Sequence, residues 1–286
     1  MTQITNVKDL NPDVTWLDLA APHVAKKARP GQFVILRNDA EGERYPLTIA
    51  NTDIENGHIT VIVQKLGKST SVLAQKKPGE YISDLLGPLG MPTRLTDKDG
   101  KPFKKVAVVG GGLGCAIAWP IAKALKEQGT EIHMIAGFRN KDIVILEEEM
   151  MRDTSFLHIC TDDGSYGTKG FVTDKLQSLI TSGDAPFDHV FAIGPLIMMK
   201  FVAKLTREAG IPTTVSMNPI MVDGTGMCGC CRVTVGGQVR FACVDGPDFD
   251  GHEVDFDETI KRNAAYREFE ARKLKEHQCN LFTQHS

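Results

Sequence analysis

One segment, residues 105–136, restricts the fold of this chain more than any other. A nearly continuous apolar run at 105–109 ends in the glycine-rich stretch 110–114, and a helical pattern then leads through Gly129 to a second apolar run at 132–136. Strand, glycine loop, helix and strand in this order form the unit of a parallel α/β sheet. We therefore expect a doubly wound parallel α/β domain. It spans residues 101–216, with further strands at 156–160 and 189–193 and helices near 172–181 and 196–209.

The residues before this domain follow a different pattern. Short runs rich in β-branched residues are separated by turn signals such as Arg29-Pro30-Gly31 and Lys77-Pro78-Gly79. Closely spaced strands of this kind form small antiparallel barrels. We expect an antiparallel β-barrel over residues 1–98, followed by a short polar linker. Its strands are predicted at residues 14–19, 32–36, 47–50 and 58–63.

The composition is that of an ordinary globular protein of about two domains. The 286 residues carry 33 basic and 36 acidic side chains, a net charge of -3, which disfavours a general nucleic-acid binder. No apolar run approaches the ~20 residues of a membrane span. The start, MTQITNVKDL, lacks a basic region followed by an apolar stretch. We therefore expect a cytoplasmic protein that binds neither nucleic acid nor membrane.

The glycine loop at 110–114 is a candidate site for an anion. Its glycines let backbone amides approach a ligand closely, and the helix that follows adds a favourable dipole for a pyrophosphate. The loop departs from the dinucleotide pattern G-x-G-x-x-G, because Cys115 stands where the third glycine would be. The end of the second strand, Gly137-Phe138-Arg139, offers no acid for a ribose. A glycine turn without a nucleotide therefore remains the alternative.

A basic and hydroxyl-rich pattern occurs in the expected barrel. Alternate residues of a strand share a face, so Arg44, Pro46 and Thr48 can line one surface. Downstream, Gly67-Lys68-Ser69-Thr70-Ser71 is typical of a helix start, where free amides can hold a phosphate. Together the two segments can hold a nucleotide diphosphate. Taken singly, each is also compatible with a salt-bridged arginine or a plain helix cap.

The most specific pattern is a group of cysteines near the carboxyl end. Plant-type 2Fe-2S sites use C-x4-C-x2-C and a distant fourth cysteine. Cys228, Cys231 and Cys243 fit the last three positions, and Asp223 occupies the first. A carboxylate can ligate iron, although it is harder than a thiolate. Cys230 remains the alternative to Asp223, and structural zinc remains the alternative metal.

The cysteines enclose a strong hairpin signal. Two short strand patterns, 232–235 and 238–241, are joined by Gly236-Gly237. We expect a small C-terminal iron-sulfur module at 217–256. A C-terminal helix is predicted at 257–286, with Ile260, Ala264, Phe269 and Leu274 as its apolar positions, either packed on its own domain or presented to a partner.

Several motifs, taken in order over nearly the whole chain, resemble those of the ferredoxin-NADP reductase superfamily. They are Pro30-Gly31-Gln32-Phe33, Arg44-x-Pro46-Leu47-Thr48, Gly87-Pro88-Leu89-Gly90, Gly110-Gly111-Gly112-x-Gly114, Gly194-Pro195 and the cysteine module. Within that superfamily, the segment 218–229 is similar to the small subunits of NADH-dependent reduced ferredoxin:NADP oxidoreductases. Electron-transfer subunits of dihydroorotate dehydrogenase are close relatives by the same resemblance, but they carry Cys where this chain has Asp223.

The resemblance implies FAD, NAD(H) and a 2Fe-2S cluster. FAD would lie on the barrel, with Arg44 and residues 67–71 at its phosphates and Thr48 near the isoalloxazine, and NAD(H) would lie over the flavin. Two departures concern the nicotinamide: Ile193 stands where many members have Cys, and Ile117 and Pro120 alter the usual proline position. The expected cofactor-binding residues are Arg44, Pro46, Leu47, Thr48, Gly67, Lys68, Ser69, Thr70, Gly110, Gly111, Gly112, Gly114, Gly194 and Pro195, and the expected metal ligands are Asp223, Cys228, Cys231 and Cys243.

The same resemblance implies a function. The chain would be an NAD(H)-dependent flavoprotein oxidoreductase subunit that exchanges electrons with a larger flavin and iron-sulfur subunit in a heterodimer. Ferredoxin and NADP(H) would react through that subunit, with flavin-based electron bifurcation as one form of the activity. Two alternatives remain: an electron-transfer subunit of an NAD-dependent dihydroorotate dehydrogenase, and a zinc-binding nucleotide module without redox activity. NAD is favoured over NADP only by the resemblance, because Arg139 can in principle meet a 2′-phosphate.

Overall fold

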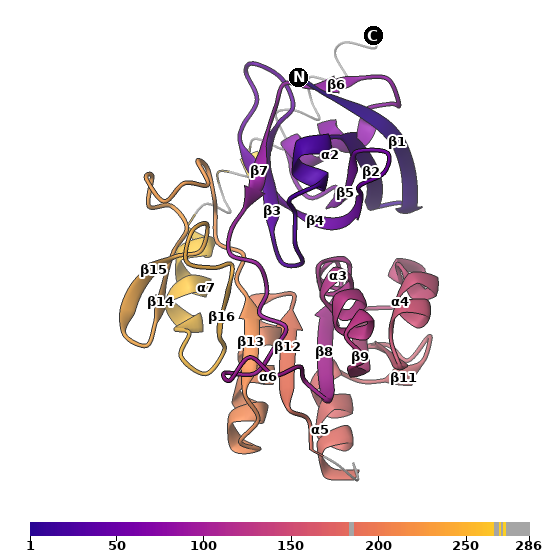
Figure 1. Ribbon diagram of the computed structural model, residues 1–286, viewed down its shortest axis with the longest axis vertical. Helices are drawn as coiled ribbons and strands as arrows, with labels where there is room; N and C mark the ends of the chain where they lie inside the picture. The colour runs from indigo at the N-terminus through magenta and orange to yellow at the C-terminus, as the bar shows by residue number, and fades with distance from the viewer. Residues whose placement is uncertain (183–185, 266–268, 270, 273–286) are drawn as a thin grey trace.

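The structure, a computed structural model, describes residues 1–182, 186–265, 269, 271 and 272. Its described part forms three bodies (Figure 1): a β-barrel at the top of the view, a parallel α/β domain below it, and a small module beside both. The predicted fold class is confirmed, because the first body is antiparallel and the second has a parallel sheet between helices.

The barrel is a nearly closed antiparallel sheet in the strand order β6-β1-β2-β5-β4-β3-β7. Side chains such as Leu17, Ile59 and Val61 alternate toward its centre and are fully buried. All four strands predicted from the sequence are present, and β1, which was not predicted, adds a fifth long strand. The elements are β1 (Thr2–Asn11), β2 (Val14–Ala20), α1 (Pro22–Ala25), β3 (Phe33–Arg37), β4 (Tyr45–Asp53), β5 (His58–Gln64), α2 (Lys68–Gln75), β6 (Tyr81–Ile82) and β7 (Asp84–Leu89).

The second body is a doubly wound sheet in the order β11-β10-β9-β8-β12-β13-β16. Two separate apolar cores, one on each face of the sheet, account for the buried strands. The order in which the strands are added reverses between β8 and its parallel neighbour β12, and such sheets bind ligands at this point. The elements are β8 (Lys105–Gly111), α3 (Gly114–Glu127), β9 (Glu131–Phe138), the 3-10 helix η1 (Lys141–Ile143), α4 (Glu147–Asp153), β10 (Phe156–Thr161), β11 (Thr168–Lys169), α5 (Val172–Ser182), β12 (His189–Ile193), α6 (Leu196–Glu208) and β13 (Thr213–Ser216).

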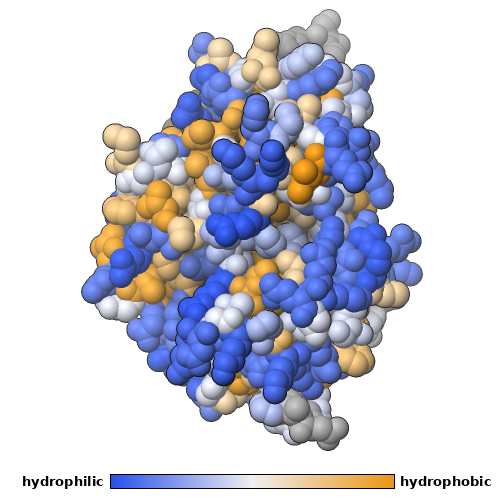
Figure 2. Space-filling model, viewed as in Figure 1, coloured by the Kyte–Doolittle hydropathy of each residue, from blue (hydrophilic) through white to orange (hydrophobic). Residues whose placement is uncertain are grey.

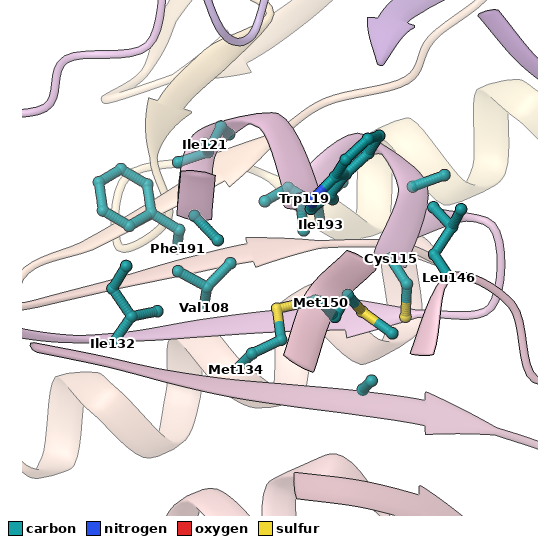
Figure 3. Close-up of a cluster of buried hydrophobic side chains, with 14 of the residues drawn as sticks. Val108, Cys115, Trp119, Ile121, Ile132, Met134, Leu146, Met150, Phe191 and Ile193 are labelled. Atoms are coloured by element: carbon teal, nitrogen blue, oxygen red, sulfur yellow. The ribbon is translucent and has the colours of Figure 1, made fainter. Parts of the chain in front are cut away.

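The barrel and the α/β domain share one hydrophobic core. Val14, Ala50 and Ile62 of the barrel belong to the same buried group as Trp119 and its neighbours on α3. The ring centroids of Trp16 and Trp119 lie 5.9 Å apart across the boundary. Figure 3 shows part of this group, in which Trp119 lies over the sheet near Ile193 and the Cys115 sulfur points toward the sheet. Because the core is continuous, the two bodies are held in a fixed relation.

The small module contains the predicted hairpin, β14 (Arg232–Val235) and β15 (Gln238–Phe241), joined at Gly236-Gly237. Its next strand, β16 (Asp248–Asp250), pairs antiparallel with β13 and so extends the sheet of the α/β domain. The helix α7 (Phe256–Ala264) covers part of the predicted helix 257–286 and packs on its own chain, as Lys200 on α6 pairs with Asp257 at 2.6 Å. Leu274, named in that prediction, lies outside the described residues.

Within the described part of the chain, every helix is too short or too polar to cross a bilayer.

Candidate functional site

The barrel presents one face of β4 away from its core. Tyr45 and Leu47 pack against the barrel core, so Arg44, Pro46 and Thr48 lie on the opposite face, as the alternation predicted. In the antiparallel register, Pro46 pairs with Ile35 and Thr48 pairs with Phe33. Residues directly opposite one another in a sheet share a face. The outward surface of β4 is therefore continuous with Phe33 and Ile35 on β3.

A hydrogen-bonded chain ties β4 to the start of α2. The Tyr45 hydroxyl donates to Asn38 Oδ1 at 2.6 Å, and Asn38 Nδ2 donates to the Ser69 carbonyl at 2.8 Å. Burial raises the pKa of Tyr45, so the phenol stays protonated and keeps donating. These hydrogen bonds bring Arg44 toward the segment 67–70, which begins α2 with Gly67 as its cap. Asn38 and Tyr45 were not singled out from the sequence, because their hydrogen bonds join segments that only the fold brings together.

The charge of Arg44 is only partly compensated. Its Nη2 lies 4.0 Å from Asp84 Oδ2, and that carboxylate is already bound by Arg37 Nε at 2.6 Å. The Arg44 side chain keeps 45% of its surface exposed. Lys68 at the first position of α2 is also exposed. This end of the barrel can therefore attract an anion such as a diphosphate.

The two glycine segments predicted to hold a nucleotide lie together at the sheet. Ile193 pairs with Gly110 in the register of β12 and β8. A methyl group added at Gly114 would overlap the carbonyl oxygen of Ile193 and lie 2.7 Å from Gly194 Cα. One added at Gly111 would lie 3.0 Å from Pro195 Cδ. Gly111 and Gly114 therefore need to be glycine for this close approach. The glycine loop and Gly194-Pro195 form one surface at the point where the strand order reverses.

Gly112 differs from the other glycines of this loop. Its φ of +56° favours glycine, and a methyl group added there would meet no atom within 4 Å. The Gly112 Cα therefore faces open space. A ligand can approach the backbone from that side.

This edge of the sheet faces the barrel. In Figure 1 the arrowheads of β12 and β13 point toward the barrel. The helix α3, which begins at the glycine loop, contacts β4 through Lys123 Nζ, 3.3 Å from Asn51 Oδ1. The glycine surface and the outward face of β4 consequently lie on neighbouring parts of one rigid body.

Two acidic residues at the same edge were not recognised in the sequence. The Asp162 amide donates to the Phe138 carbonyl at 3.0 Å, and the Asp163 amide donates to the Arg139 carbonyl at 3.3 Å. Hydrogen bonds from Ser165 hold the pKa of Asp163 below its usual value. Arg139 and two carboxylates thus follow adjacent strands, β9 and β10. Their relation could have been inferred only from the strand order.

The structure brings two of the proposed metal ligands together. Cys231 Sγ lies 3.2 Å from Cys243 Sγ, and both side chains are buried. Burial and this thiol hydrogen bond raise the pKa of Cys243 to about 12. Cys228 is exposed, and Cys230 Sγ lies 4.0 Å from the Cys228 carbonyl. Across the described ranges, no three His, Cys, Asp or Glu side chains already form a metal-ligating group.

Asp223 lies at the start of the loop that carries Cys228. Its Oδ2 accepts from the amides of Met227 at 3.1 Å and Cys228 at 2.9 Å, and its Oδ1 accepts from Thr225 at 3.1 Å. Partial burial would raise the pKa of Asp223, but these hydrogen bonds outweigh it and hold the pKa at about 2. Asp223 is therefore an ionised carboxylate that folds the loop around itself.

The buried cysteines pack directly on the barrel. Cys231 and Cys243 share an apolar group with Phe33 and Ile35 of β3. A methyl group added at Gly224 would lie 2.9 Å from Ile35 Cδ1, so the loop of Asp223 is pressed against the same strand. Phe33 and Ile35 share a face with Thr48 and Pro46 of β4. Neighbouring strands are about 4.8 Å apart, so the cysteine pair and the outward face of β4 lie side by side.

The donor set fits an iron-sulfur cluster. Metals bind thiolates, and metal binding releases the thiol protons. Two buried, mutually hydrogen-bonded thiols supply half of a four-ligand set, and an ionised carboxylate and an exposed thiol lie on the adjoining loop. The fit requires Cys228 and Asp223 to turn toward the buried pair. The short loop 223–231, with Gly224, Gly226 and Gly229 at positive φ, has the backbone freedom for such a movement.

Comparisons with known proteins agree with this arrangement. Residues 108–204 match the family described as "Oxidoreductase NAD-binding domain", and residues 218–255 match "Iron-sulfur cluster binding domain of dihydroorotate dehydrogenase B". A Thermotoga maritima protein named "Dihydroorotate dehydrogenase B (NAD(+)), electron transfer subunit homolog" is 48% identical, over 94% of this chain and 93% of the relative. The corresponding electron transfer subunit of Geobacillus kaustophilus is 35% identical, over 83% of this chain and 91% of its own.

Solved structures show the same fold. One, described as giving insights into flavin-based electron bifurcation via the NADH-dependent reduced ferredoxin-NADP oxidoreductase structure, matches with a TM-score of 0.90 and 46% identity. The match covers 97% of this chain and 98% of that one. An Amycolatopsis cytochrome P450 reductase, at 22% identity and a TM-score of 0.58, covers 72% of this chain and 65% of its own and shows the likeness of fold alone.

Barrel, doubly wound domain and cysteine module together define an oxidoreductase subunit built on the ferredoxin-NADP reductase fold, with an NAD-binding domain and an iron-sulfur-binding domain. More narrowly, the chain belongs to the family of dihydroorotate dehydrogenase B electron transfer subunits and their homologues, with which it shares up to 48% identity among the named members compared here.

Proposed function

We propose that this chain is an electron-transfer subunit that exchanges electrons with NAD(H) through FAD on the barrel and a 2Fe-2S cluster on the cysteine module. The packing of Cys231 and Cys243 against β3, beside the outward face of β4, carries this proposal. Two of the proposed metal ligands lie next to the surface proposed for the flavin. A structural zinc site would have no reason to occupy that position.

The residues of the barrel fit a flavin nucleotide. Arg44 and the start of α2, at Gly67, Lys68, Ser69 and Thr70, would hold the diphosphate. Pro46, Leu47 and Thr48 would lie along the ring system, with their backbone or their outward side chains. When bound, FAD would accept one hydride, and with it two electrons, from NADH, and a 2Fe-2S cluster would carry the electrons onward one at a time.

NAD(H) would bind at the glycine surface of Gly110, Gly111, Gly112, Gly114, Gly194 and Pro195. We propose that Asp162 and Asp163 favour NAD over NADP, because carboxylates repel a 2′-phosphate. Arg139, on the neighbouring strand end, remains the residue that would oppose this preference. Replacing both aspartates by Asn should therefore raise the affinity for NADPH more than that for NADH. Equal effects on the two nucleotides would exclude this role.

The cluster ligands would be Asp223, Cys228, Cys231 and Cys243. Cys230 is the alternative to Asp223. The pairing of Cys231 with Cys243 supports two of the four positions, and the bonding of Asp223 to the amide of Cys228 supports their neighbourhood.

We further propose a heterodimer with a larger flavin and iron-sulfur subunit, through which ferredoxin and NADP(H) react. Electron bifurcation is one form that this activity can take. The relatives named as electron transfer subunits support the assembly. We propose that the partner binds at the surface around the cysteine loop, because the hydrophobic side chains there are exposed: Met227 is 88% exposed and Val239 is 59% exposed. Figure 2 shows hydrophobic atoms on the left side of this face, over the small module.

A subunit serving dihydroorotate oxidation is the second candidate, and the family names favour it. The 46% identity to the ferredoxin-NADP oxidoreductase chain over 97% of this sequence favours the first. The partner that co-purifies with the chain from its own cells separates the two. We place the protein in the cytoplasm, since all six cysteines of the described residues are free thiols.

The experiment is anaerobic purification of the full chain with its partner, followed by cofactor analysis. The proposal predicts a flavin absorption band that NADH bleaches, and about two irons for this chain. A chain without flavin, or with zinc in place of iron, would refute it.

A further inference from the structure

The helix α7 reaches into the cysteine loop through one side chain. Arg262, in its last turn, donates from Nη1 to the Arg232 carbonyl at 2.6 Å and from Nη2 to the Cys230 carbonyl at 3.3 Å. These two carbonyls lie on either side of Cys231 in the chain. Arg262 is partly buried, and so is its hydrogen bond to the Cys230 carbonyl. A planar guanidinium is suited to holding two acceptors at once.

A second arginine supports the same loop. Arg232 Nη1 donates to the Gly229 carbonyl at 3.2 Å. Two successive carbonyls, of Gly229 and Cys230, are therefore held by arginines. In a trans peptide the C=O and N–H bonds point in opposite directions. The amides of Cys230 and Cys231 are consequently turned away from the guanidinium groups.

Arg262 also brings a positive charge that no carboxylate of the described residues pairs with. The ion pairs of the described residues do not include Arg262, and the nearby acid Asp257 is paired with Lys200. Asp255 at the start of α7 accepts from the Glu258 amide and caps the helix. Among the described residues, the Arg262 guanidinium donates its hydrogen bonds to the backbone carbonyls beside Cys231. In a partly buried site such a charge is weakly screened.

We propose that Arg262 is a positioning residue for the iron-sulfur cluster: it fixes the peptide units around Cys231 and makes the cluster easier to reduce. This inference rests on the proposed function. One-electron reduction adds one negative charge to a thiolate-ligated centre, and a nearby fixed positive charge stabilises that state more than the oxidised one. Hydrogen bonds and charge near the sulfurs are known determinants of such potentials.

The test is an EPR-monitored redox titration of the full chain with its partner, comparing Arg262→Gln with the wild type. We expect Arg262→Gln to shift the cluster midpoint potential to a more negative value while the flavin content stays unchanged. Lys261→Gln is the matched control, since it removes the same charge from the exposed neighbouring position. It should leave the midpoint unchanged. Arg262→Lys, which keeps the charge but not the two-armed donor, should lie between Arg262→Gln and the wild type.

An unchanged or more positive midpoint in Arg262→Gln would overturn the proposal, and so would an equal shift in Lys261→Gln. If Arg262→Gln loses the cluster but keeps its flavin, while Lys261→Gln keeps both, the positioning role is supported and Arg262→Lys then measures the effect of charge. A wild-type protein without any iron-sulfur signal would instead refute the proposed function itself. The two failures are therefore distinguishable.

Discussion

At the scale of single residues, Asp223 has two roles. It folds the loop by accepting from three backbone amides, and the spacing to Cys228 makes it the candidate first ligand. Asparagine keeps one acceptor oxygen, which can still bind the amides of Met227 and Cys228, but its neutral amide is a weaker ligand for iron than a carboxylate. The loop-folding role and the ligand role are therefore separable by substitution.

We predict that Asp223→Asn keeps the fold but loses or alters the cluster. Asp223→Cys should retain a 2Fe-2S cluster, because a thiolate suits iron. Cys230→Ser should leave the cluster intact. Iron content and the EPR spectrum of the reduced protein measure all three. A cluster that survives Asp223→Asn unchanged but is lost in Cys230→Ser would assign the fourth ligand to Cys230.

The glycine loop yields a paired prediction. Gly112→Ala places a methyl group in open space at positive φ, a strain of about 1–2 kcal/mol. It should therefore weaken NADH binding with only a modest loss of stability. Gly114→Ala drives the methyl group into the Ile193 carbonyl and should lower the free energy of unfolding by about 1–3 kcal/mol or more. Denaturant unfolding and NADH titration measure the two effects. A larger loss of stability in Gly112→Ala would contradict the assignment.

Some of the functional residues could be predicted from the sequence, and Arg262 could not. The face of Arg44, Pro46 and Thr48 followed from strand alternation, and the cysteine spacing singled out Cys231 and Cys243. Arg262 was not recognised, because it lies 32 residues from the carbonyl it binds at Cys230. In the sequence, an arginine near a helix end that binds a distant loop cannot be told from one that only interacts with the helix dipole. Its role depends on how α7 packs.

At the scale of elements, the segment after the barrel ties the module to the barrel. The Gln32 side chain donates to the Gly90 carbonyl at 2.7 Å, and the Met91 amide donates to the Gly246 carbonyl at 2.6 Å. Thr93 Oγ1 then lies 2.5 Å from Asp248 Oδ2 on β16. Two motifs of the sequence, at 30–33 and 87–90, thus help to dock the module. Burial raises the pKa of the Asp248 carboxyl that Thr93 contacts.

We predict that Thr93→Val loosens this docking. Losing the hydrogen bond to a carboxyl oxygen enclosed by the fold should cost about 1–3 kcal/mol. Stopped-flow measurements with NADH should show flavin reduction at the wild-type rate and slower reduction of the cluster. Thr181→Val, on the exposed side of α5, is the matched control and should change neither rate. Equal slowing of both steps in Thr93→Val would mean that Thr93 affects the whole fold.

Local signals predicted most elements. Gly236-Gly237 predicted the position of the hairpin turn correctly, since this turn needs positive φ at both positions. β1 was missed because its residues are mostly polar, and it is stabilised by pairing with β2 and β6. β16 was missed because three residues give no periodicity. Its pairing with β13 joins parts of the chain that the sequence placed in separate domains.

At the scale of the whole molecule, stability should depend on pH through partly buried histidines. Burial lowers the pKa of His189 to about 4, and burial likewise lowers that of His158 to about 4. In the unfolded chain both would titrate near 6.5. Between these values the unfolded state binds more protons than the folded state, so stability falls as pH falls through this window. The slope is at most about 1.4 kcal/mol per pH unit for each histidine.

The test is urea unfolding between pH 7 and pH 5. His189→Gln can still bond to Thr214, which His189 Nε2 contacts at 2.8 Å, but does not titrate. It should show a smaller loss of stability over this range than the wild type. An identical loss in both proteins would show that His189 does not titrate as its burial requires.

The shared core of barrel and α/β domain gives the molecule its central property. Trp16 and Trp119 join the two bodies, and Cys231 and Cys243 join the module to β3. The proposed NAD, flavin and iron-sulfur sites therefore lie on neighbouring surfaces of one structure. The sequence predicted the three bodies and their order. It could not predict their contacts, since apolar residues on outward strand faces have the same pattern whichever partner covers them.

The most direct test of this account is an anaerobic titration of the purified complex with NADH, followed by optical and EPR spectroscopy. We expect the flavin band to bleach and the signal of a reduced 2Fe-2S cluster then to rise. In the double variant Cys231→Ser/Cys243→Ser the cluster signal should be lost while the flavin bleaching remains. A flavin that is reduced by NADH while the wild-type cysteine module gives no such signal would contradict it.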